Sequence, residues 1–164
     1  MLNIKDLHPL LQDKMNQFIK LCSDNKIDVV ITQGFRTWEY QAGLYAQGRT
    51  SPGKVVTNCQ PGWSPHNYGL AFDFAIKENN QIDWDTRNRK WGDAGKLGES
   101  LGLTWGGIWK SFPDMPHLEY LFGLTIEKLH SGVKPPNTVK ILKVSDLALA
   151  GKTIKVGKDI YKLV

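Results

Sequence analysis

The sequence predicts an α+β fold, in which helices flank a central antiparallel sheet and a short β extension follows at the C-terminus. Short β-branched segments and amphipathic stretches alternate irregularly, without the strand–helix–strand repetition that builds parallel sheets. The chain has 164 residues, 41% of them hydrophobic, which is enough for one substantial core. Lysines accumulate toward the end, so we expect a main domain over residues 1–130 and a basic β-rich extension over residues 131–164.

Helices are expected where apolar side chains recur at three- and four-residue steps, or where a capping residue opens such a run. The clearest stripe runs from Leu7 to Cys22 and predicts a buried Cys22 thiol. Thr37 is a suitable N-cap, and Gly102 is a typical residue just past a helix end. The expected helices cover about residues 7–23, 37–47, 91–101 and 125–130.

Strands are expected in short β-branched segments and where polar and apolar residues alternate. In residues 70–76, Asp73 shares a face with two alanines, while Phe72 and Phe74 point to the other face. Later, His117 and Glu119 share one face of a second alternating segment. The expected strands cover residues 27–32, 70–76, 103–105 and 117–121, and then 138–144, 153–156 and 160–163, with a loop over residues 48–63.

Several classes of protein are excluded by composition. No apolar run approaches the about 20 residues of a membrane span. The first residues lack the charged-then-apolar layout of a signal peptide, so we expect synthesis in the cytoplasm without a leader. Cys22 and Cys59 form no framework pattern, and a disulfide is not expected.

Two segments carry the residues with the most specific chemistry. Residues 64–73 include His66 and Asp73, and residues 114–117 include Asp114 and His117. A hydrolytic zinc site needs three protein ligands and a base for the water, and these four side chains supply both. Asp73 lies in an otherwise apolar strand, where an unpaired carboxylate is costly. By spacing alone the signal is weak, and a turn-capping aspartate is the alternative for Asp114.

Three motifs in order make the signal specific. The pattern Ser64-x-His66-x-x-Gly69-x-Ala71-x-Asp73 resembles the signature of the zinc D-Ala-D-Ala carboxypeptidase family, also called VanY-like. The upstream segment around Arg36, Gly34-Phe35-Arg36-Thr37-x-Glu39-x-Gln41, resembles the arginine segment of that family. The segment from Trp105 to His117 is similar to its L-alanyl-D-glutamate peptidase branch of phage endolysin type, although Ile108 and Leu118 depart from the pattern. The resemblance covers about residues 5–130.

This resemblance implies a hedgehog/D-Ala-D-Ala peptidase-like fold and a peptidoglycan hydrolase that cuts the L-Ala–D-Glu bond of stem peptides. It implies that Zn²⁺ is bound by His66, Asp73 and His117. Asp114 would then take the proton of the water, and Arg36 would donate to the substrate carbonyl. Substrate contacts are implied for Ser64, Trp63, Tyr68, Trp105 and Trp109, with core packing as the alternative for the aromatic residues.

Two rival functions stay open: a D,D-carboxypeptidase on the same scaffold, and a non-catalytic wall-binding protein that keeps zinc as structure. With no leader, an endolysin would act on the cell wall after release from the host cell.

The net charge of +5 comes from the tail alone. Residues 1–129 contain 14 Lys+Arg and 14 Asp+Glu, whereas residues 130–164 contain seven lysines and two aspartates. The tail either adds strands to the main sheet, which we favour, or binds anionic wall polymers, or associates with itself through strand edges. Nucleic acid is not an expected partner, because the tail lysines alternate with aliphatic residues and the tail has no arginine and no aromatic residue except Tyr161.

Overall fold

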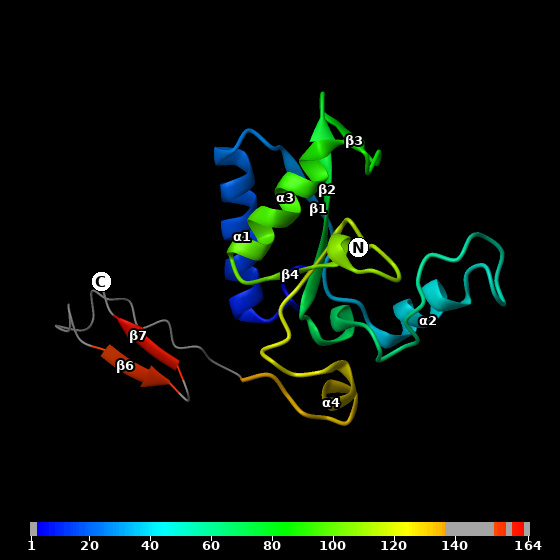
Figure 1. Ribbon diagram of the computed structural model, residues 1–164. Coiled ribbons are helices and arrows are strands. Elements are labelled where there is room, and N and C mark those ends of the chain that lie inside the picture. The colour runs from blue at the N-terminus through cyan, green and yellow to red at the C-terminus, as the bar shows by residue number, and fades with distance from the viewer. Residues whose placement is uncertain (1–2, 137–152, 157–158, 163–164) are drawn as a thin grey trace.

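The computed structural model describes residues 3–136, 153–156 and 159–162, and its centre is an open antiparallel sheet (Figure 1). The strand order is β1-β2-β5-β4, and β3 pairs with β2. The strands are β1 (Val29–Gln33), β2 (Ala71–Glu78), β3 (Gln81–Asp83), β4 (Thr104–Trp105) and β5 (His117–Glu119). The α+β class with an antiparallel sheet is therefore confirmed.

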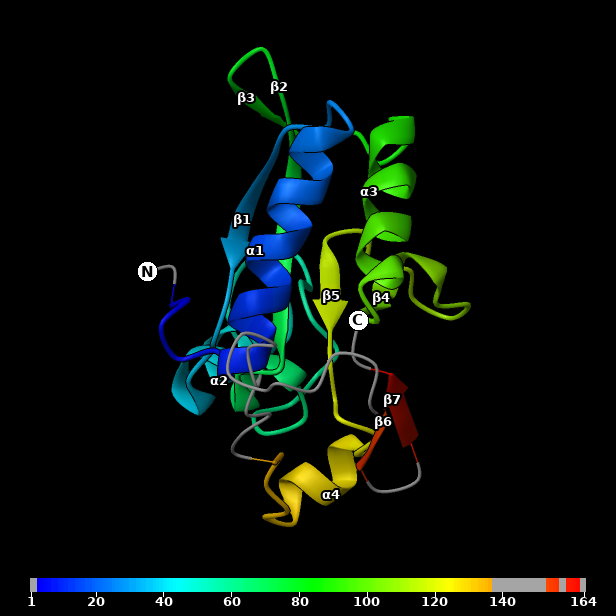
Figure 2. The ribbon, with the colours of Figure 1, turned by 90° about the vertical axis from the view of Figure 1, so that its left-hand side faces the viewer.

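Two helices cover one face of this sheet, and the other face is left to loops and a shorter helix (Figures 1 and 2). The covering pair is α1 (Pro9–Asp24) and α3 (Arg89–Ser100), which lie side by side in Figure 2. The remaining helical elements are α2 (Trp38–Ala46), α4 (Ile126–His130) and the 3-10 turns η1 (Pro65–Tyr68) and η2 (Gly106–Ile108). Within the described residues, no helix is long and apolar enough to cross a membrane.

The core forms between the helix pair and one face of β2. Phe18 of α1 packs edge-on against Phe74, with ring centroids 5.0 Å apart, and Trp91 of α3 lies 5.3 Å from Phe74 on a tilted plane. All three side chains are fully buried. The predicted alternation of β2 is thus realised, and Asp73 points to the face that the helices do not cover.

Local signals explain most element boundaries. The Thr37 hydroxyl accepts a hydrogen bond from the Tyr40 N–H at 3.1 Å and caps α2, as predicted. At α1 the cap is His8, whose Nδ1 accepts from the Leu10 N–H at 3.2 Å. Strand β3 was not predicted, although Asn79 and Asn80 are both left-handed, with φ of 50° and 63°, as a tight hairpin turn requires.

The tail does not extend the main sheet in the part of the chain that the structure describes. Strands β6 (Thr153–Val156) and β7 (Asp159–Lys162) pair with each other in a separate two-stranded antiparallel sheet. These two strands were predicted, but the prediction that they join the main sheet was wrong. The expected strand over 138–144 lies outside the described residues. The domain boundary near residue 130 stays a prediction.

Helix α3 lies so close to the sheet that Gly95 has no room for a side chain. A Cβ at Gly95 would overlap the indole ring of Trp105, whereas a Cβ at Gly92 would meet nothing within 4 Å. We expect Gly95→Ala to lower the free energy of unfolding by about 1–3 kcal/mol through overpacking. The matched Gly92→Ala variant should gain about 0.5–1 kcal/mol, because alanine favours a helix. Urea unfolding measures both, and equal stability of the two variants would contradict this packing.

Candidate metal centre and active site

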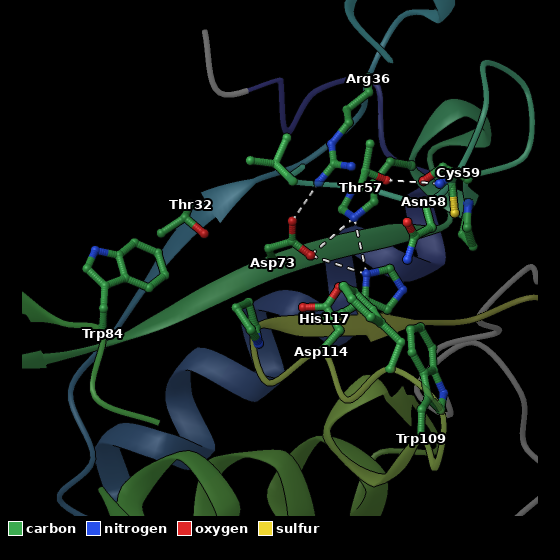
Figure 3. Close-up of a pocket in the computed structure, with 16 residues that line it drawn as sticks. Thr32, Arg36, Thr57, Asn58, Cys59, Asp73, Trp84, Trp109, Asp114 and His117 are labelled. Carbon is green, nitrogen blue, oxygen red and sulfur yellow. Dashed lines mark hydrogen bonds and ion pairs between the residues drawn. The ribbon is translucent and has the colours of Figure 1, made fainter. Parts of the chain in front are cut away.

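Three donor atoms converge on the uncovered face of the sheet (Figure 3). Asp73 of β2 pairs directly with His117 of β5, so their side chains leave the sheet together. His66 arrives from η1, just before β2. Asp73 Oδ1 lies 3.1 Å from His66 Nε2 and 3.2 Å from His117 Nδ1, and these two nitrogens are 3.2 Å apart.

The outer nitrogen of each imidazole is held by an acceptor. His66 Nδ1 donates to the Gly34 carbonyl at 2.8 Å, and His117 Nε2 donates to Glu119 Oε2 at 2.9 Å. Because the outer nitrogens carry hydrogen, the inner nitrogens of neutral rings present lone pairs to Asp73. Such an outer acceptor is a regular partner of a histidine that binds a metal, since it fixes the tautomer and the ring.

The converging atoms need a positive charge among them. Burial lowers the pKa of His117, but Asp73 and Glu119 outweigh it and raise that pKa to about 9. Burial also lowers the pKa of His66, which keeps this ring neutral despite Asp73. The positive charge is therefore either a proton on His117 or a metal ion that replaces it. Two imidazoles and one carboxylate within 4.8 Å of one another fit zinc.

Arg36 is bound to the metal-ligand candidate Asp73. Its Nη2 donates to Asp73 Oδ2 at 2.7 Å, which leaves Oδ1 for the cluster. Its Nη1 donates to Gln41 Oε1 at 3.4 Å, and the Gln41 amide in turn donates to the Cys59 carbonyl at 2.8 Å. Arg36 also lines the cleft, and its buried Nε has no partner in the described part of the chain. Gln41 stood in the Arg36 motif, yet its role as a fully buried support was not predicted.

Asp114 lies beside the cluster without joining it (Figure 3). Burial raises the pKa of its carboxyl above the ordinary value, and the nearby imidazoles and Arg36 offset only part of that rise. Among the described residues no hydrogen bond ends on this carboxylate, so the alternative of a turn-capping side chain has no support. The loop is fixed by the Asp114 N–H, which donates to the Gly106 carbonyl at 3.0 Å. A Cβ at Gly106 would lie 2.7 Å from the Asp114 carbonyl oxygen, so the close approach requires glycine.

A cleft of about 390 Å³ opens over these groups. Of the five residues predicted to contact substrate, Ser64 and Trp109 line it. Tyr68 instead donates its hydroxyl to the Gly62 carbonyl at 2.7 Å. Trp105 is buried in the core, where its Nε1 donates to the Met115 carbonyl at 2.9 Å. Trp63 lines a neighbouring hollow.

Two aromatic residues of the cleft mouth were not predicted. Trp84 and Phe112 line the cleft and are 57% and 54% exposed. Trp84 stacks on Trp91 of the core, with centroids 6.2 Å apart, and this contact holds its ring at one end of the cleft. The sequence gives no signal for Trp84, because the strand that it follows, β3, was not predicted and its exposure is a property of the fold.

The glycine of the first motif, Gly69, is required by the backbone. Its φ is +67°, and a Cβ there would lie 2.5 Å from the Asp6 carbonyl oxygen. Gly69 therefore allows the left-handed turn and the close backbone contact that end η1.

Glu119 is expected to strengthen metal binding through His117. The Glu119→Gln variant keeps a hydrogen-bond acceptor for His117 Nε2 but loses the negative charge that makes this imidazole a stronger metal ligand. Zinc affinity should therefore fall about tenfold or more. Competition with a chromophoric chelator measures the affinity, and excess zinc should restore activity. The exposed Glu39→Gln variant is the control. Unchanged affinity in Glu119→Gln would contradict the role.

Comparisons with known proteins agree on one family. Residues 57–120 match the family model described as D-alanyl-D-alanine carboxypeptidase. The chain is 44% identical over 124 residues to the peptidoglycan L-alanyl-D-glutamate endopeptidase CwlK of Bacillus subtilis, covering 71% of this chain and 74% of that protein. It is 28% identical over 143 residues to the L-alanyl-D-glutamate peptidase of Listeria phage A118, covering 84% of this chain but only 47% of the phage protein.

Solved structures show the same fold at low sequence identity. The L-Ala D-Glu endopeptidase ChiX of Serratia marcescens superimposes with a TM-score of 0.53 and 21% identity, over 73% of this chain and 84% of ChiX. The D,D-pentapeptidase VanY, solved with Zn(II), gives a TM-score of 0.53 and 13% identity, over 76% of this chain and 78% of VanY.

Proposed function

Because this chain belongs to the D-alanyl-D-alanine carboxypeptidase family of peptidases, in the group of the L-alanyl-D-glutamate endopeptidases, we propose that it is a zinc-dependent peptidoglycan hydrolase. The bond cleaved is the one between L-Ala and D-Glu in the stem peptide. One observation carries the proposal: a free carboxylate, Asp114, stands beside three converging donors in an open cleft.

The residues of the site have separate roles in the proposed hydrolysis. His66, Asp73 and His117 would hold zinc, and Arg36 orients Asp73 through its second oxygen. Bound zinc supplies a nucleophile at neutral pH and polarises the scissile carbonyl. Burial strengthens Asp114 as a base, because a raised pKa favours the protonated form.

Asp114 transfers a proton from the attacking water to the leaving nitrogen during cleavage of the peptide bond. Asp114 accepts the proton of the attacking water while the water oxygen adds to the L-Ala carbonyl carbon. Asp114 returns that proton to the D-Glu nitrogen as the C–N bond breaks, which leaves a carboxylic acid and a free amine. The remaining proton of the acid then passes to the amine, and the products are a carboxylate and an ammonium group. Arg36 lines the cleft and supplies positive charge for the developing oxyanion.

Mass spectrometry of digested peptidoglycan tests the proposed bond. The expected products carry a new D-Glu amino terminus, with L-Ala left on the glycan side. The second candidate is a D,D-carboxypeptidase, favoured by the description of the matching family model. Release of terminal D-alanine with intact L-Ala–D-Glu bonds would establish that candidate and overturn the first.

An endolysin role and a wall contact by the tail belong to the same proposal. The phage relative supports the endolysin role. The tail lysines would attract anionic wall polymers, so binding to purified walls should weaken steeply with salt. Salt-insensitive binding would contradict that contact.

A further inference from the structure

A second hollow adjoins the cleft beside the metal-ligand candidates. This hollow has a volume of about 430 Å³ and is lined by Asn58, Cys59, Gln60 and Trp63. Asn58 and Cys59 also line the cleft, so the two depressions share a wall. Figure 3 shows Asn58 and Cys59 on the opposite side of the cluster from Trp84. A ligand seated in the cleft can therefore extend into the hollow at that end.

Trp63 presents a rigid aromatic surface in this hollow. One face of its ring stacks on His130, with centroids 4.5 Å apart and planes 25° apart. His130 stacks in turn on Trp38, at 5.8 Å and 9°. His130 Nδ1 donates to the Gly62 carbonyl at 3.1 Å, which fixes the middle ring. Trp63 still exposes 38% of its surface, so a ligand meets a ring that needs no further ordering.

The other lining groups are polar but uncharged. Asn58 and Gln60 provide amide donors and acceptors. Burial raises the pKa of the Cys59 thiol, so this group stays neutral. Asn58 Oδ1 accepts from Arg49 Nη2 at 3.1 Å, which orients the amide. A flat indole with neutral amides matches a pyranose ring, whose C–H face is apolar and whose hydroxyl and N-acetyl groups form hydrogen bonds.

We propose that this hollow is a glycan subsite, which binds the N-acetylated sugar that carries the stem peptide. The inference rests on the proposed function, because the L-Ala residue of a stem peptide is attached directly to that sugar. A sugar one residue from the scissile bond would lie next to the cleft, and the hollow adjoins the cleft at Asn58 and Cys59.

Two substrates with the same scissile bond test the subsite: a free stem peptide, and the same peptide attached to its disaccharide. For the unmodified protein, kcat/KM should be higher on the glycan-bearing substrate. In Trp63→Ala the ratio of the two kcat/KM values should fall roughly tenfold, the order of one aromatic stacking contact. Trp63→Phe keeps a ring face and should recover most of the ratio, which separates stacking from misfolding.

Trp84→Ala is the matched control, since Trp84 is an exposed tryptophan at the other end of the cleft. It should alter both rates alike and leave the ratio unchanged. An equal loss on both substrates in Trp63→Ala, or no loss on either, would overturn the glycan subsite.

A binding measurement needs no turnover and separates this inference from the proposed reaction. Calorimetry with a tetramer of N-acetylglucosamine should show binding to the unmodified protein and at least tenfold weaker binding to Trp63→Ala. Absence of binding to the unmodified protein overturns the subsite even where the L-Ala–D-Glu bond is cut. Binding without cleavage of either substrate supports the subsite and overturns the reaction.

Discussion

Replacing Asp114 with asparagine is expected to reduce kcat by about 10²–10⁴-fold, the usual contribution of a general base. Asparagine matches the shape of aspartate but cannot take a proton. The bound zinc should remain, because Asp114 is not one of the three converging donors. Release of new amino groups from purified peptidoglycan gives the rate, and atomic absorption gives the metal content.

The exposed Asp13→Asn variant controls for loss of a negative charge. Undiminished hydrolysis by Asp114→Asn would exclude Asp114 as the base. A protein that binds walls but never hydrolyses them, with Asp114 intact, would favour the non-catalytic alternative.

Removal of the metal is expected to abolish hydrolysis and to lower the melting temperature. Three polar side chains converge in a nearly buried site, and a metal ion held there would bind only the folded chain. At free zinc of 1,000 times Kd, the stabilisation by mass action is about 4 kcal/mol. Thermal unfolding with chelator and with added zinc measures the shift. His66→Ala should show no zinc-dependent shift, and an equal shift in that variant would place the metal elsewhere.

Zinc binding should also depend on pH in a defined direction. Without metal, the pKa of His117 is about 9, so the ring holds a proton at neutral pH. Zinc must displace that proton, and its affinity should therefore fall as the pH drops below about 9. Zinc titrations at several pH values, with proton release followed by calorimetry in two buffers, measure the effect. Affinity that does not vary with pH would exclude His117 as a ligand.

Much of the geometry of the candidate metal centre was predictable because it follows from strand alternation. Asp73 had to point away from Phe72 and Phe74, and the pairing of β2 with β5 then placed His117 beside it. The motifs supplied the partner residues that pairing alone does not give. The outer contacts were not predictable in this way. The bond of Glu119 to His117 depends on the orientation of an imidazole ring, which no spacing determines.

The aromatic residues were the least predictable part of the site. Trp105 and Trp109 occur four residues apart in one motif, yet Trp105 is buried in the core and Trp109 lines the cleft. The difference arises from α3, where Gly95 leaves space for the Trp105 ring. That space is a tertiary property, formed by residues that are distant from the motif. The same holds for Trp63, which stacks on His130 of α4, a residue far from it in the sequence.

The direct pairing of Asp73 with His117 has a consequence for folding itself. If β5 slipped by one residue along β2, His117 would turn to the helix-covered face, and no ion could bridge the two strands. If Asp73 and His117 hold the metal as we propose, only the correctly paired chain gains its binding energy. The metal would then favour the correct strand pairing as well as supply the nucleophile for the reaction.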